Sequence, residues 1–74
     1  MNSFYTFSYK TKKSNQKDVK LYASDYDDAI MKGAIILEKL NNDLDLIGYD
    51  SWDDVVADCY DYNIEVSDLN MLEE

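Results

Sequence analysis

Proline, histidine and arginine are all missing from this 74-residue sequence, which holds only one cysteine and two glycines. Histidine is the usual general base near neutral pH and a common zinc ligand, so its absence argues against acid–base and zinc catalysis. There is also no glycine-rich phosphate loop, and we expect no catalytic residue, cofactor or metal ion. The lone Cys59 cannot form an internal disulfide, which favours a reducing location such as the cytoplasm. No apolar run is long enough to span a membrane, and we expect no membrane partner.

The composition is that of a small folded domain. Hydrophobic residues make up 46% of the sequence and aromatic residues 14%, unlike the low hydrophobicity of disordered chains. A chain this short can bury one modest core. We therefore expect residues 1–74 to form a single small domain.

Negative charge is concentrated in the second half of the chain. Residues 1–39 contain all seven lysines and five acidic residues, whereas residues 40–74 contain eleven acidic residues and no lysine. A protein that binds nucleic acid by neutralising phosphates needs clustered basic residues. We therefore expect no direct contact with nucleic acid, and we expect the partner to be a basic protein.

Two alternating segments near the start predict an antiparallel β-hairpin. Residues 4–10 place Tyr5, Phe7 and Tyr9 on one face, and residues 18–23 alternate in the same way after a polar turn. A helix should follow the hairpin and pack on one of its faces, because apolar residues then recur at three- and four-residue steps.

This first helix has recognisable start and stop signals. Ser24 is the expected N-cap, Asp27 is its expected capping-box partner, and Asn41 with Asn42 should end the helix. Ser51 repeats the start signal and opens a second helix that continues to about Asn63.

The tail after the second helix holds either a short strand at residues 64–66 or a frayed turn, which periodicity does not separate. The predicted fold class is α+β, with the N-terminal antiparallel hairpin packed against two α-helices and a short third strand left open.

The second predicted helix has an acidic side and an apolar side. At about 100° per residue, three further aspartates fall within about 40° of Asp54, whereas Trp52, Val55 and Cys59 face the opposite way. These four residues form the acidic row: Asp50, Asp54, Asp58 and Asp61. Aspartate is a poor helix former, and like charges four residues apart cost about 0.2–0.5 kcal/mol per pair. The row is therefore locally unfavourable.

Two interpretations of the acidic row compete. One is a solvated face that only keeps a small protein soluble. The other is a mimic of nucleic acid, because carboxylates four residues apart on a helix are spaced by about 6 Å, close to neighbouring phosphates on one strand. Tyrosines at the margins support a contact surface, since tyrosine is enriched at interfaces. The candidate partner-binding residues are Asp50, Asp53, Asp54, Asp58, Asp61, Tyr49, Tyr60, Tyr62 and Glu65.

The acidic, tyrosine-rich run "DSWDDVVADCYDYNIE", from Asp50 to Glu65, together with the small size and ββα-type pattern, resembles the small acidic anti-defence proteins of phages. This class includes anti-CRISPR inhibitors that mimic DNA, and its members share no sequence signature. The resemblance implies a non-enzymatic inhibitor of a host defence nuclease, such as the Cas effector Cas9, whose Arg and Lys side chains normally contact DNA. The alternative is an antitoxin-like or phage regulatory module that binds another basic protein. Competition with DNA would favour the mimic, and dimerisation would favour the regulatory module.

A calcium-binding loop is a third alternative. Positions 1, 3, 6, 9 and 12 of an EF-hand loop are taken by Asp43, Asp45, Gly48, Ser51 and Asp54. Position 5 is Ile47, which offers no oxygen ligand, and position 12 is an aspartate where a bidentate glutamate normally reaches the ion. We therefore expect no specific calcium site, and we expect Leu44, Leu46 and Ile47 to belong to the core.

Overall fold

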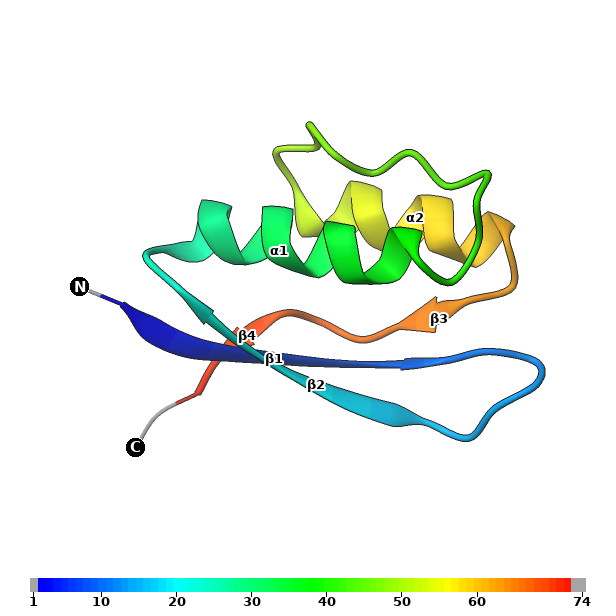
Figure 1. Ribbon diagram of the computed structural model, residues 1–74, viewed down its shortest axis with the longest axis horizontal. Coiled ribbons are helices and arrows are strands. Elements are labelled where there is room, and N and C mark those ends of the chain that lie inside the picture. Colours follow the sequence, from blue (N-terminus) through cyan, green and yellow to red (C-terminus); the bar gives the residue numbers. More distant parts are fainter. Residues whose placement is uncertain (1, 73–74) are drawn as a thin grey trace.

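The computed structural model describes residues 2–72 and places two helices on one face of a small antiparallel sheet (Figure 1). In chain order the elements are β1 (Ser3–Lys10), β2 (Lys17–Ala23), α1 (Tyr26–Glu38), α2 (Trp52–Asp61), β3 (Glu65–Val66) and β4 (Asn70–Met71). The central strand is β1, which pairs with β2 on one edge and with β3 and β4 on the other. The predicted α+β class and the N-terminal hairpin are confirmed.

The hairpin gives the sheet one apolar face. Tyr5 lies opposite Leu21 and Phe7 lies opposite Val19, so the register puts the apolar residues of both strands on the same side. Tyr5, Phe7 and Leu21 are buried under the helices, and Val19 is half-buried. The alternation that predicts the two strands is therefore also the alternation that builds the core.

The helices meet the sheet at the ring of Trp52. Its centroid lies 4.9 Å from that of Phe7, and its Nε1 donates a hydrogen bond to the carbonyl of Ser67 at 2.8 Å. α1 presents Gly33 at this point, where a Cβ atom would lie 2.8 Å from two atoms of the Trp52 ring. The missing side chain at Gly33 therefore lets α1 approach the tryptophan.

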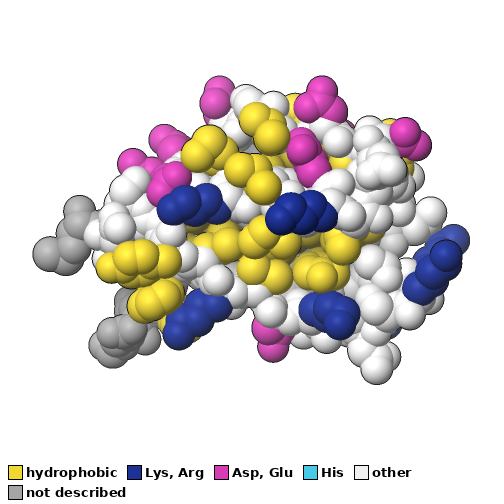
Figure 2. Space-filling view, in the orientation of Figure 1, with side chains coloured by type: hydrophobic (Ala, Val, Ile, Leu, Met, Phe, Trp, Pro, Cys, Tyr) yellow, Lys and Arg dark blue, Asp and Glu magenta, His cyan; other side chains and the backbone are white. Residues whose placement is uncertain are grey.

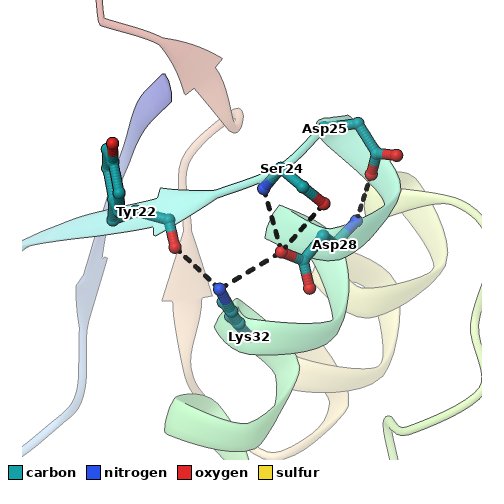
Figure 3. A network of polar contacts seen from close by, with 5 residues as sticks. All are labelled: Tyr22, Ser24, Asp25, Asp28 and Lys32. Carbon is teal, nitrogen blue, oxygen red and sulfur yellow. Dashed lines mark hydrogen bonds and ion pairs between the residues drawn. The ribbon is translucent and has the colours of Figure 1, made fainter. Parts of the chain in front are cut away.

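α1 begins one residue later than the sequence predicts. The N-cap is Asp25 rather than Ser24, and its Oδ1 accepts a hydrogen bond from the Asp28 N–H at 2.8 Å (Figure 3). Asp28 Oδ2 in turn accepts from the Ser24 N–H at 3.0 Å, so Asp28 instead of Asp27 returns a side-chain hydrogen bond, to the residue before the N-cap. Asp28 also forms an ion pair with Lys32 at 3.1 Å, whereas the sequence offers no cation one turn beyond Asp27.

α2 begins as predicted and ends two residues early. Ser51 is its N-cap, because the Ser51 Oγ accepts a backbone N–H in the first turn. At the other end Asn63 has a φ of 64°, and the N–H groups of Asn63 and Ile64 donate to the carbonyls of Tyr60 and Cys59. This is a Schellman closure, which ends the helix and turns the chain toward β3.

The tail after α2 runs along β1. Of the two alternatives for residues 64–66, the structure has the short strand, β3, which comprises residues 65 and 66 without residue 64, and β4 is an additional strand. Between β3 and β4, the Ser67 N–H donates to the Ser8 carbonyl at 2.9 Å. Beyond β4, the Leu72 N–H donates to the Phe4 carbonyl at 2.8 Å. This side of β1 is therefore covered, and β2 forms the opposite edge of the sheet.

Candidate functional site

The acidic row lies along the outer side of α2. Asp50, Asp54 and Asp61 are exposed, and Asp58 is half-buried. The opposite side of the helix is buried through Trp52, Val55 and Cys59. Burial therefore follows the predicted division of this helix into an acidic and an apolar side.

The acidic row is not compensated by neighbouring cations. Among residues 2–72 the single ion pair joins Lys32 to Asp28, far from the row in sequence and on the other helix. The last turn of α2 contains no basic residue, and Asp58 and Asp61 lie there at the negative end of the helix dipole. A charge of the wrong sign at a helix end costs about 0.3–1 kcal/mol. α2 therefore carries these carboxylates at the expense of its own stability.

Tyr49 holds one member of the row in place. Its hydroxyl donates a hydrogen bond from the loop to Asp58 Oδ2. This bond, followed by burial and the charges of Asp58, Asp54 and Asp45, raises the pKa of Tyr49 to about 12. Tyr49 is thus a half-buried positioning residue instead of a free aromatic at the margin. The charge of Asp45 also acts on this hydroxyl from the loop, which helical spacing alone does not predict.

Asp53 belongs to a different acidic group. Burial raises the pKa of the Tyr26 hydroxyl, and the charges of Asp68 and Asp53 raise that pKa further. The same hydroxyl donates to the carbonyl of Leu69 at 3.2 Å, which places this group at the start of α1. The charges of Asp53 and Asp68 therefore both act on the Tyr26 hydroxyl, and the sequence pattern did not single out Asp68.

Three of the predicted partner-binding residues lie near lysines: Tyr60, Tyr62 and Glu65. Tyr60 is 69% exposed and lines a hollow of about 320 Å³ together with Glu65, Lys10 and Lys12. Glu65 lies directly opposite Lys10 in the β1–β3 pair. Tyr62 is the C-cap of α2 and lines a neighbouring hollow that also includes Lys12. Of these three residues, Tyr60 offers the largest exposed aromatic surface beside α2.

The connection between α1 and α2 is held by Glu38. Its Oε2 accepts hydrogen bonds from the N–H groups of Leu46 at 2.6 Å and Ile47 at 3.0 Å. Leu44 and Leu46 are buried as predicted, but Ile47 is 56% exposed, because Leu46 takes the core position beside it. Within residues 2–72, no three His, Cys, Asp or Glu side chains are grouped so that they could hold a metal ion.

Cys59 is a core thiol. Its side chain is fully buried, and burial followed by the charge of Asp58 raises its pKa to about 11. A nucleophilic thiol needs an electropositive and accessible setting that lowers the pKa. The environment of Cys59 has the opposite character.

No protein-family model, curated protein or solved structure matches this chain. In the part of the chain that the structure describes, no helix has the length and apolar character needed to cross a membrane. The geometry and charge of the surface residues must therefore support any functional conclusion.

Proposed function

We propose that this protein is a non-enzymatic inhibitor of the phage anti-CRISPR type, which presents the acidic row to the nucleic-acid-binding groove of a defence nuclease in the bacterial cytoplasm. The observation that carries the proposal is the arrangement of the row. Three of its carboxylates are exposed, the fourth is fixed by a tyrosine hydroxyl, and none of the four forms an ion pair within the described residues. A face that served solubility alone could mix glutamate with lysine and avoid the like-charge repulsion.

The geometry of the row suits a groove built to hold phosphates. Asp54 and Asp58 lie one helical turn apart, a rise of about 6 Å, which approximates the spacing of successive phosphates. The Tyr49 hydroxyl fixes Asp58 before binding, so less side-chain freedom is lost on association. Arg and Lys side chains in such a groove would form charge-assisted hydrogen bonds with these carboxylates. Because long-range attraction between charges is screened by salt, association should slow as ionic strength rises.

A neutral replacement of the row tests this proposal. The variant D50N/D54N/D61N removes three exposed charges, keeps side-chain size and leaves the Tyr49–Asp58 bond intact. The control D27N/D43N/D68N removes the same charge from exposed positions outside the row.

The measurements are DNA cleavage by purified Cas effectors and competition with labelled target DNA by fluorescence anisotropy. We expect the wild type and the control to displace DNA, and we expect the row variant to bind at least about tenfold more weakly. A folded row variant that inhibits as strongly as the wild type would eliminate the acidic row as the contact surface.

The antitoxin-like or phage regulatory module is the second candidate, and the exposed edge of β2 is the observation that favours it. Modules of this kind act by assembling with other protein chains, and an open strand edge is a ready assembly surface. A regulatory module would bind its basic partner without displacing DNA, so the competition measurement separates the two candidates.

A further inference from the structure

Within the described residues, β2 is the sheet edge with the longest uncovered backbone. It pairs with β1 alone, whereas β3 and β4 cover the other side of β1. The end of β2 is closed by α1, because the Tyr22 carbonyl accepts from Lys32 Nζ at 2.7 Å and the Ser24 N–H donates to Asp28 (Figure 3). The middle of the strand lacks such a cover among the hydrogen bonds of residues 2–72.

Strand geometry fixes which backbone groups of β2 point outward. In an antiparallel strand the N–H and C=O of one residue point to the same side, and successive residues alternate. The Val19 carbonyl faces β1, since it accepts a hydrogen bond from Thr6 Oγ1 at 3.0 Å. The Tyr22 carbonyl faces away from β1, toward Lys32. Asp18 and Lys20 therefore present their N–H and C=O groups at the open edge.

We propose that the protein forms a two-fold symmetric dimer in which β2 pairs antiparallel with β2 of a second copy, with Val19 on the symmetry axis. In this register Asp18 lies directly opposite Lys20 of the second copy, and the pair occurs twice. Each facing pair can exchange both of its backbone hydrogen bonds. Opposite charges directly across two strands are favourable, so the charges of β2 are complementary to those of its own copy.

Two observations exclude the neighbouring registers. Placing Lys20 on the axis would bring two Lys20 side chains face to face and would require the Tyr22 carbonyl, which Lys32 already occupies. Placing Lys17 or Asp18 on the axis would likewise set two like charges opposite each other. It would also move the pairing to the end of β2, beside the polar turn. Only the register centred on Val19 combines opposite charges with unoccupied backbone groups.

Pairing of the two copies around this axis would also cover apolar surface beside the strand. Figure 2 shows apolar side chains gathered between lysines over α1 and the strands below it. On α1, Ile35 is 41% exposed, and Ile36 of α1 and Val19 of β2 are both half-buried and pack against the core. Pairing two β2 edges would bring these strips of the two copies together and remove them from water.

The dimer leaves the acidic row exposed. α1 packs over β2, whereas α2 packs against β3 on the other side of β1 (Figure 1). The inference therefore does not depend on the proposed inhibitory function: dimerisation by this edge would favour the regulatory module, and it leaves the acidic row free to compete with DNA. Competition with DNA still decides between them.

Sedimentation equilibrium of the full chain over about a hundredfold range of concentration tests the dimer. We expect a reversible monomer–dimer equilibrium for the wild type. The variants D18K and K20D each set like charges opposite one another twice, and each should weaken the dimer by about tenfold or more. The double variant D18K/K20D restores opposite pairs with reversed polarity and should recover dimerisation. K12D, in the hairpin turn outside the pairing, is the matched control and should dimerise like the wild type.

A wild type that stays monomeric at every concentration would overturn the inference. So would a dimer that tolerates both single reversals, or a double variant that fails to recover. Hydrogen exchange of the wild type provides a readout that needs no variant. The Lys20 N–H should exchange more slowly as protein concentration rises, and concentration-independent exchange at this amide would contradict pairing through β2.

Discussion

Replacing Gly33 with alanine should destabilise this protein, although the same change usually strengthens a helix. In an exposed helix interior alanine is about 1 kcal/mol more favourable than glycine. Here the new Cβ would lie 2.8 Å from Cη2 and Cζ3 of Trp52 and 3.3 Å from Cε1 of Phe7. Carbon atoms pack at about 3.5–4.0 Å, so the Trp52 ring would have to move by about 0.7 Å or more.

The Trp52 ring has little room for such a movement. It is 4% exposed, its Nε1 donates to the Ser67 carbonyl at 2.8 Å, and its centroid lies 4.9 Å from that of the tilted Phe7 ring. Overpacking a well-filled core costs about 1–3 kcal/mol, and a lost hydrogen bond adds about 0.5–1.5 kcal/mol. After subtracting the gain in helix propensity, we expect Gly33→Ala to lower the free energy of unfolding by about 0.5–3.5 kcal/mol.

Urea denaturation, followed by circular dichroism and by the fluorescence of the single tryptophan, measures this loss. Ala57→Gly at an exposed position of α2 is the control for helix propensity in the same protein. Trp52→Phe removes the ring atoms that the new Cβ meets, so Gly33→Ala should cost less in that background than in the wild type. A Gly33→Ala protein as stable as the wild type would refute the steric reasoning.

Three further predictions follow from local geometry. Asn63→Gly should raise stability by about 0.5–1 kcal/mol, because glycine adopts the positive φ of this cap without strain; a loss in urea denaturation would contradict this assignment. The pKa of Tyr49 rises from its ordinary 10.0 to about 12, so its contribution to stability is present below pH 10 and is lost as pH rises through 12. Stability measured from pH 9 to 12 should therefore fall less steeply for Tyr49→Phe than for the wild type, and equal slopes would count against the Tyr49–Asp58 bond. Titration calorimetry should show no saturable calcium site, and a micromolar site lost in Asp43→Ala would reverse that expectation.

The parts of the fold that the sequence predicts depend on short-range periodicity. The alternation around Tyr5 and Phe7 predicts β1 and its buried face, because neighbouring side chains in a strand must point to opposite sides. The helical wheel predicts the two sides of α2 for an equivalent reason. In both elements, the pattern within one segment already contains the distinction between core and surface.

The features that the sequence does not predict depend on contacts between segments. Nothing near Gly33 in the chain indicates that Trp52 will lie against it, and the Tyr49–Asp58 bond joins a loop to a helix whose relative placement is unknown beforehand. The start of α1 is a smaller case of this kind. Ser24 and Asp25 are both acceptable N-caps, and the ion pair of Asp28 with Lys32 accompanies the choice of Asp25.

The fold converts the uneven charge of the sequence into two separate surfaces. The strand order β2-β1-β3 and the placement of α1 and α2 put Lys17 and Lys20 at the open edge and the acidic row on the other side. Because acidic rows repel one another, self-association is favoured at β2 and a basic partner at α2. The two surfaces share no residue, so K20D should not change the affinity of one acidic row for one nuclease site, and D50N/D54N/D61N should not weaken the dimer. These affinities can be measured separately by anisotropy and sedimentation. If K20D weakens nuclease binding as much as the row variant does, the target must engage both copies of a dimer at once, and the acidic row would act as a paired surface instead of a single one.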